Sequence, residues 1–76
     1  MGERHTEEMR LLGLTIAFYR RARGLTQSEL AEAVQISRTH MSNIEAPNTK
    51  TSISLNLLFD IAEALDIPVK ELFDFQ

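Results

Sequence analysis

The segment from residue 38 to residue 46 carries side chains that are suited to recognition rather than to bond-making chemistry. Drawn as a helix, it places its polar side chains beside one another: Arg38, Thr39, His40, Ser42 and Asn43. These groups supply hydrogen-bond donors and acceptors in fixed geometries. No Glu or Lys lies on this side of the helix. Their absence would be unusual for a helix side that serves only to interact with water. An ordinary solvated helix face is the alternative interpretation.

The rest of the sequence offers little for catalysis or metal binding. There is no cysteine, which excludes disulfides, zinc–thiolate sites and thiol nucleophiles. The two histidines, His5 and His40, lie far apart in the sequence, so a metal site is not expected. No phosphate-binding loop or dinucleotide fingerprint is present. We expect a protein that is not an enzyme and that needs neither cofactor nor metal.

The length and composition predict one small folded domain. The chain has 76 residues, of which 43% are hydrophobic and 25% are charged, an ordinary mixture for a folded protein. No apolar run is long enough to cross a membrane, and no basic-then-apolar leader is present. We expect a single all-α domain over residues 1–76, located in the cytoplasm, without a membrane partner and with residues 1–6 flexible.

Two short helices are predicted to meet at an angle just before and within the polar segment. Thr26 and Glu29 have the spacing of a capping box, which marks the start of a helix. Ser37 is a natural N-cap for a second helix over residues 38–45. Because only residues 35–37 join the two helices, they must cross steeply, as in a helix-turn-helix.

Three further helices are predicted around this pair, over about residues 6–23, 53–65 and 69–73. Gly24 ends the first of them, and Pro47 and Pro68 end the helices that precede them. Apolar residues at helical spacing predict the core: Leu12, Ile16, Tyr19, Leu30, Ala31, Val34, Met41, Ile44, Leu55, Leu58, Ile61, Ala62 and Leu65.

The charges are distributed unevenly along the chain. The net charge is −3, which is not typical of a nucleic-acid-binding protein. However, residues 20–50 carry five basic and three acidic residues, whereas residues 51–76 carry one basic and five acidic residues. This asymmetry is consistent with one face that meets an anion and another turned away from it, although solvated helix faces would give a similar pattern.

The polar side of residues 38–46 has the chemistry to enter the major groove of DNA, which is wide enough for a helix. There Arg38 would pair with guanine, Asn43 with adenine, and Thr39 would touch a thymine methyl group. His40, at the flank, would contact a phosphate or a base edge.

Two stretches of the sequence resemble the phage-repressor-type (Cro and lambda-repressor-like, XRE-type) helix-turn-helix family. They are GLTQSELA at residues 24–31 and ISRTHMSNIE at residues 36–45, and the resemblance covers about residues 9–73. It implies a compact five-helix DNA-binding domain that acts as a transcriptional regulator, as a homodimer on a two-fold double-stranded DNA operator. Whether the chain is a controller protein, a phage switch or an antitoxin is left open.

The resemblance also implies roles for single residues. The expected base contacts are Gln27, Arg38, Thr39, Ser42 and Asn43. The expected phosphate contacts are Arg23, Thr26, His40, Asn48, Thr49, Lys50 and Thr51. Arg20 and Glu45 stand where the family often has an ion pair between the first helix and the end of the recognition helix. Gln35 stands where the family commonly has a glycine with positive φ, so we expect a strained residue there.

Several large apolar residues fall outside the predicted core. A dimer interface within about residues 53–76 is predicted from Leu57, Phe59, Ala64, Phe73 and Phe75. On the first helix, Leu11, Leu14 and Phe18 form a second patch, which covers the C-terminal tail or binds something else. Scattered apolar residues are also normal on any surface. The alternative function is therefore a helix-turn-helix module whose main ligand is a protein, such as a toxin or a polymerase subunit.

Overall fold

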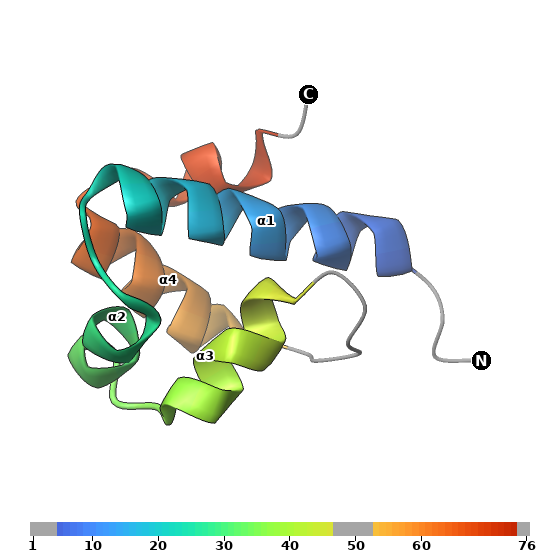
Figure 1. Ribbon diagram of the computed structural model, residues 1–76. Helices are drawn as coiled ribbons and strands as arrows, with labels where there is room; N and C mark the ends of the chain where they lie inside the picture. The colour runs from blue at the N-terminus through green and yellow to red at the C-terminus, as the bar shows by residue number, and fades with distance from the viewer. Residues whose placement is uncertain (1–4, 47–52, 75–76) are drawn as a thin grey trace.

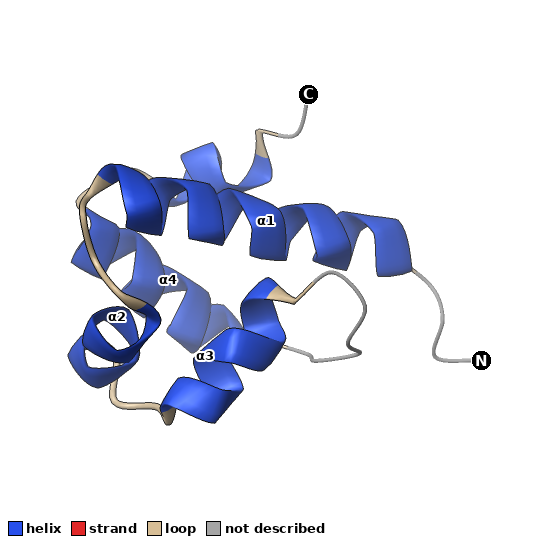
Figure 2. Ribbon diagram, viewed as in Figure 1, coloured by secondary structure: helices blue, strands red, loops and turns tan. Residues whose placement is uncertain are grey.

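The computed structural model describes residues 5–46 and 53–74, and this part of the chain is helical (Figure 1). The elements are α1 (Thr6–Ala22), α2 (Gln27–Ala33), α3 (Arg38–Glu45), α4 (Leu55–Leu65) and the short 3-10 helix η1 (Val69–Phe73). Figure 2 shows no strand in these described ranges, which confirms the all-α prediction. The described chain has four α-helices rather than five, because the last predicted helix is a 3-10 helix.

The helices are arranged around α1, the longest of them. α3 packs on α1 and on α2, and α4 packs on α1 and α2. η1 contacts both α1 and α4. In Figure 1, η1 lies above α1 and α3 lies below it, so these two elements occupy different sides of α1.

Short polar side chains fix where the three central helices begin. The Thr26 hydroxyl accepts a hydrogen bond from the Glu29 backbone N–H at 3.0 Å, and the Thr26 N–H donates to the Glu29 carboxylate at 2.8 Å. The capping box predicted for α2 is therefore present. Ser37 caps α3 by accepting from the His40 N–H, and Ser54 caps α4 in the same way.

Two residues in the left-handed region produce the turns on either side of α2. Gly24, with φ +74°, follows α1, and Gln35, with φ 63°, follows α2. The Gln35 conformation agrees with the strained turn that the sequence predicts, since a residue with a Cβ is disfavoured there. The next N–H, of Ile36, donates to Ala31 at 2.9 Å and closes the end of α2.

One hydrophobic core joins all five elements, and its centre is formed by Ile16, Leu30, Met41, Ile61, Leu65 and Leu72. Two leucines of α4 differ from the sequence prediction. Leu57, predicted for the dimer interface, is only 9% exposed and belongs to the core, whereas Leu55, predicted for the core, is 65% exposed. Residues i and i+2 of an α-helix lie about 200° apart around its axis, so only one of Leu55 and Leu57 can face the core. It takes Leu57, because the buried stripe of α4 includes the adjacent Leu58.

Some of the predicted residues lie outside the described ranges. These are four expected phosphate contacts, one expected interface residue and most of the N-terminal segment that is predicted to be flexible: Asn48, Thr49, Lys50, Thr51, Phe75 and residues 1–4. Within the described ranges, no helix has the length and apolar character that crossing a membrane requires.

Candidate nucleic-acid interface

α3 presents its polar side to solvent and its apolar side to the core. Met41 and Ile44 are buried against the rest of the molecule. The four α3 residues predicted to contact bases lie on the other side, three of them exposed and Ser42 half-buried: Arg38, Thr39, Ser42 and Asn43. His40 is half-buried at the flank. The structure therefore brings these side chains together over two turns of one helix.

The first turn of α3 is electrostatically suited to an anion. It begins at Arg38 and has no acidic residue. The helix N-terminus adds a partial positive charge, which attracts anions. In the part of the chain that the structure describes, no carboxylate forms a salt bridge with Arg38. Within the described ranges, the charge of the Arg38 guanidinium is therefore not neutralised by an ion pair.

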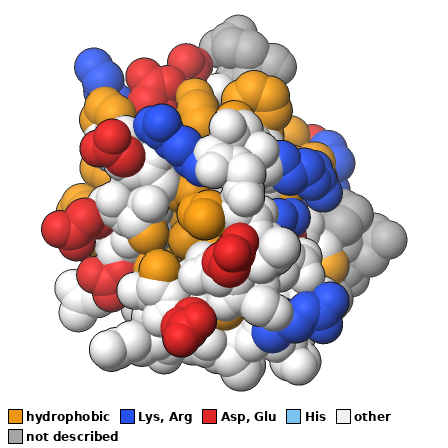
Figure 3. Space-filling view, turned by 60° about the vertical axis from the view of Figure 1, so that its left-hand side comes forward, with side chains coloured by type: hydrophobic (Ala, Val, Ile, Leu, Met, Phe, Trp, Pro, Cys, Tyr) orange, Lys and Arg blue, Asp and Glu red, His pale blue; other side chains and the backbone are white. Residues whose placement is uncertain are grey.

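Acidic side chains are gathered elsewhere. Figure 3 shows one face of the molecule, on which Asp and Glu side chains lie mostly to the left and several Lys and Arg side chains lie to the right. Asp60 and Glu63 of α4 are exposed, as is Asp74 after η1. Some Lys and Arg side chains also lie at the upper left, beside the acidic ones, so the two charges are only partly separated on this face.

The last residue of α3 is fastened to the two preceding helices. The Arg20 guanidinium of α1 donates to both oxygens of the Glu45 carboxylate, from Nε at 2.7 Å and from Nη2 at 3.0 Å. The Gln27 amide of α2 donates a third hydrogen bond to Glu45, at 2.9 Å. Arg20 and Glu45 are only 8% and 6% exposed. This is the ion pair that the family resemblance implies, and it joins α1, α2 and α3.

Each nitrogen and oxygen of the ion pair has a hydrogen-bond partner, which matters because a buried charge is costly when a partner is missing. The remaining Arg20 nitrogen, Nη1, donates to the Leu25 carbonyl at 2.7 Å. Over the described residues, no buried side-chain nitrogen or oxygen lacks a hydrogen-bond partner. The carboxylate therefore holds the end of α3 in one position relative to α1.

Gly13 also positions α3, a role that its place in the sequence did not predict. A Cβ on Gly13 would lie 2.2 Å from the Ile44 carbonyl oxygen, far inside contact distance. Only a glycine lets α1 cross the end of α3 so closely. A glycine inside an otherwise amphipathic helix costs about 1 kcal/mol relative to alanine, and this cost would have pointed to a packing role.

Two residues predicted to contact DNA have other partners. Gln27, predicted to contact a base, donates to Glu45 as described. Arg23, predicted to contact a phosphate, donates from Nε to the Leu65 carbonyl at 2.7 Å and from Nη2 to the Asp66 carbonyl at 3.0 Å. The last carbonyls of a helix have no partner within the helix, and a cation is favourable there. Arg23 thus stabilises the end of α4.

Known proteins share this arrangement. The helix-turn-helix family HTH_3 matches residues 16–72. The chain is 34% identical over 64 residues to the HTH-type transcriptional regulator SinR of Bacillus subtilis (strain 168). That match covers 84% of this chain and 57% of SinR, so the chain spans little more than half the length of this relative.

Solved structures agree with the sequence comparison. The restriction-modification controller protein C.AhdI from Aeromonas hydrophila has a TM-score of 0.81 at 30% identity, over 88% of this chain and 98% of that one. SinR, the master regulator for biofilm formation, in complex with DNA has a TM-score of 0.74 at 35% identity, over 83% of this chain and 98% of that one. With the capped α2, the steep turn at Gln35 and the fastened α3, these matches show that the chain belongs to the XRE-type, Cro-like helix-turn-helix family.

Proposed function

We propose that this chain is a sequence-specific double-stranded DNA-binding transcriptional regulator, in which α3 enters the major groove. The observation that carries the proposal is the exposed polar side of α3 on a helix whose far end is held by Glu45. The similarity to SinR, a regulator whose structure was solved in complex with DNA, supports it.

The base contacts proposed for α3 follow from the chemistry of each side chain. Arg38 reads a guanine through two hydrogen bonds, Asn43 reads an adenine, and Thr39 contacts a thymine methyl group. Ser42 lies between them and donates or accepts as the base pair requires. Each good bidentate contact discriminates by about 1–3 kcal/mol against the wrong base.

Phosphate contacts are proposed for the residues around α3. His40 at the flank of α3 and Thr26 at the start of α2 lie in the described chain, and both remain at least partly accessible. Asn48, Thr49, Lys50 and Thr51 keep this role as a proposal from the sequence. Gln27 supports Glu45, and its base contact stays a proposal from the sequence, as does the phosphate contact of Arg23.

A homodimer on a two-fold operator is also part of the proposal. Phe59 on α4 and Phe73 at the end of η1 are about half exposed, at 49% and 51%, and Ala64 is half-buried. Large apolar groups in water favour association. A dimer would place two copies of α3 in successive major grooves about 34 Å apart. Light scattering of the purified chain, compared with a Phe59→Asp variant, measures this association.

Selection from a random duplex DNA library, followed by affinity measurements at several salt concentrations, tests the function. We expect enrichment of a two-fold symmetric sequence, with an affinity that falls steeply with salt. Arg38→Ala and Asn43→Ala should each weaken binding about 5- to 150-fold and relax the preference at one base pair, as expected for the loss of 1–3 kcal/mol. Lys70→Ala on η1 removes a positive charge away from α3 and is the matched control.

Two results would contradict the proposal. One is the absence of any enriched sequence. The other is equal loss of affinity in Arg38→Ala and Lys70→Ala, since binding would then follow the total charge rather than the surface of α3.

A further inference from the structure

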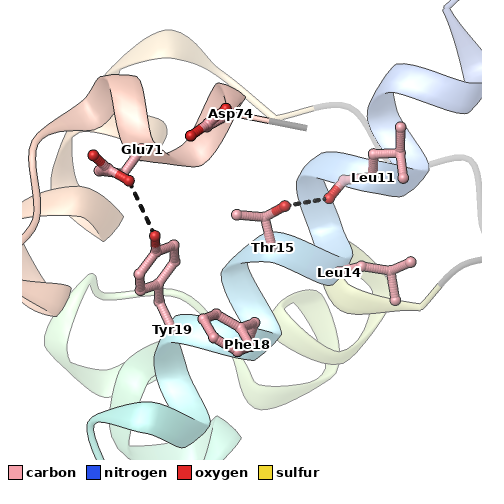
Figure 4. A pocket seen from close by; sticks show the side chains of 7 residues that line it. All are labelled: Leu11, Leu14, Thr15, Phe18, Tyr19, Glu71 and Asp74. Atoms are coloured by element: carbon pink, nitrogen blue, oxygen red, sulfur yellow. Dashed lines mark hydrogen bonds between the residues drawn. The ribbon is translucent and has the colours of Figure 1, made fainter. Parts of the chain in front are cut away.

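A groove on the other side of α1 is not explained by DNA recognition. It lies between α1 and η1 and has a volume of about 320 Å³. Figure 4 shows the α1 side chains along one wall and the carboxylates of Glu71 in η1 and Asp74 just after it along the other. We call it the α1–η1 groove and define it by Leu11, Leu14, Phe18 and Tyr19 together with Glu71 and Asp74.

The α1 wall of this groove is apolar and accessible. Leu14 is 40% exposed and Phe18 is 62% exposed. The Phe18 ring meets Tyr19 edge to face, with ring centroids 5.2 Å apart, so it is backed by another aromatic side chain. The Thr15 hydroxyl on the same wall donates to the Leu11 carbonyl at 2.8 Å. The wall therefore offers mainly hydrocarbon surface to a partner.

The opposite wall is acidic. The Tyr19 hydroxyl donates to Glu71 Oε1 at 3.1 Å. Across the described ranges, neither Glu71 nor Asp74 forms a salt bridge. The two carboxylates give this wall its negative charge. The pKa of Tyr19 is raised, first by its hydrogen bond to Glu71, then by burial and by the charges of Glu71 and Asp74. A cation brought by a partner would find both carboxylates available.

We propose that the α1–η1 groove binds an amphipathic helix of another protein, with apolar residues facing Leu14 and Phe18 and a Lys or Arg facing Glu71 and Asp74. Leu11 to Phe18 is two helical turns, about 10 Å, which suits anchors spaced by three or four residues. The basic residue is required by the charge of the η1 wall.

A second copy of this chain fits the groove less well than a basic helix does. A two-fold contact would place the same surface on both sides. The groove residues of the second copy would bring two more carboxylates and no Lys or Arg to pair with Glu71 and Asp74, which is electrostatically unfavourable. The charge of the groove therefore favours a partner of opposite sign.

The location of the groove makes this proposal independent of the proposed DNA binding. α3 and η1 lie on different sides of α1 (Figure 1), so a bound helix leaves the polar side of α3 accessible. The partner and a DNA duplex are therefore expected to bind the chain at the same time.

A random library of 14-residue peptides, displayed on phage and selected on the whole chain, identifies the preferred ligand. Counter-selection uses the Phe18→Asp variant, and Phe18→Ser repeats it with a milder change. We expect enriched peptides with apolar residues at i, i+3 or i+4, and i+7, and at least one Lys or Arg. The enriched peptide is then synthesised with a fluorescent label, and its affinity is measured by anisotropy.

The carboxylates are tested with variants that keep their shape. Glu71→Gln with Asp74→Asn retains an oxygen that accepts from Tyr19, and should weaken the selected peptide about tenfold. Asp60→Asn with Glu63→Gln removes the same charge from α4, outside the groove, and should leave the affinity unchanged. Circular dichroism confirms that each variant is folded.

Four outcomes would overturn the proposal. Peptides that bind Phe18→Asp as well as the wild type would show that they do not bind in the groove. Enriched peptides that are acidic would show that the carboxylates do not select the partner. A wild-type dimer that Phe18→Asp turns into a monomer would make a second copy the occupant. Changes in the Leu14 and Phe18 amide NMR shifts on Phe75→Ser would make the chain's own end the occupant.

Discussion

Arg20 and Glu45 join α1 to the last residue of α3 through two hydrogen bonds, Nε to Oε2 at 2.7 Å and Nη2 to Oε1 at 3.0 Å. Both side chains are buried, and the amide of Gln27, which lies in α2, donates a further hydrogen bond to the Glu45 carboxylate. Since a bidentate pair restricts orientation as well as distance, it fixes the orientation of the end of α3 relative to α1.

Glu45→Ala is expected to destabilise the fold strongly. It leaves the Arg20 guanidinium buried without its carboxylate, and breaking such a pair costs about 3–5 kcal/mol in the free energy of unfolding. Urea unfolding followed by circular dichroism measures this. DNA affinity is expected to fall as well, although Glu45 faces the core rather than the solvent.

The matched control replaces both partners by apolar residues. Arg20→Met with Glu45→Leu buries no unpaired charge, so most of the lost stability should return. If Glu45→Ala unfolds at the wild-type urea concentration and binds DNA normally, the ion pair has no role.

Gly13→Ala is expected to lower the free energy of unfolding even though alanine favours helices. The gain in helix propensity is about 1 kcal/mol. The added Cβ would lie 2.2 Å from the Ile44 carbonyl oxygen, and this backbone atom yields only if α1 and α3 separate. Overpacking of this kind costs about 1–3 kcal/mol.

Gly24→Ala serves as the comparison for Gly13→Ala. A Cβ on Gly24 meets no atom within 4 Å, so its cost comes from φ +74° alone. NMR shifts at Ile44 should therefore move in Gly13→Ala and not in Gly24→Ala. A Gly13→Ala variant more stable than the wild type would contradict the close approach.

Gln35→Gly is expected to stabilise the protein. Gln35 has φ 63°, a conformation that costs a residue with a Cβ about 1–2 kcal/mol. Glycine loses more entropy on folding, about 0.5–1 kcal/mol, so the net gain is at most about 1.5 kcal/mol. Thermal unfolding measures it. Ala33→Gly, in the last turn of α2, should be destabilising, and an equal effect of both glycines would refute the argument from φ.

Tyr19 is expected to titrate above its ordinary pKa of about 10. Its hydrogen bond to Glu71 is the largest cause, followed by burial and the nearby carboxylates. Because the folded pKa is raised, the stabilisation is complete below the ordinary value and is lost as the pH rises through the folded value. Tyr19 is the only tyrosine and the chain has no tryptophan, so absorbance at alkaline pH reports this group alone.

Glu71→Gln tests the cause of the Tyr19 shift. The amide oxygen still accepts a hydrogen bond, but the negative charge is gone, so the Tyr19 pKa should move back toward its ordinary value. Glu63→Gln is the control, since Glu63 lies on α4 outside the groove. Identical titration midpoints in the wild type and Glu71→Gln would contradict the assigned cause.

Local chemistry explains why much of the fold was predictable. The caps at Thr26 with Glu29 and at Ser37 are hydrogen bonds within one helical turn. Their roles can therefore be predicted from residues that are close in the sequence. The strain at Gln35 follows in the same way from the short turn that it must make.

The missed features depend on contacts between distant parts of the chain. Arg23 finds the carbonyls of Leu65 and Asp66, more than forty residues away. The choice between Leu55 and Leu57 is made by the partners of α4, because either leucine fits an amphipathic pattern. The role of Gln27 was predicted from the family resemblance. Its hydrogen bond to Glu45 depends on how α1, α2 and α3 pack together, which the local sequence does not show.

α3 is attached to the rest of the molecule through its buried side, by Met41 in the core, Ile44 against Gly13 and Glu45 against Arg20. The exposed Arg38 and Thr39 take no part in these contacts. Mutagenesis of those positions therefore exchanges surface chemistry without disturbing the scaffold. Libraries randomised at Arg38 and Thr39 should yield folded proteins in high proportion, which makes the chain a compact starting point for engineering new recognition.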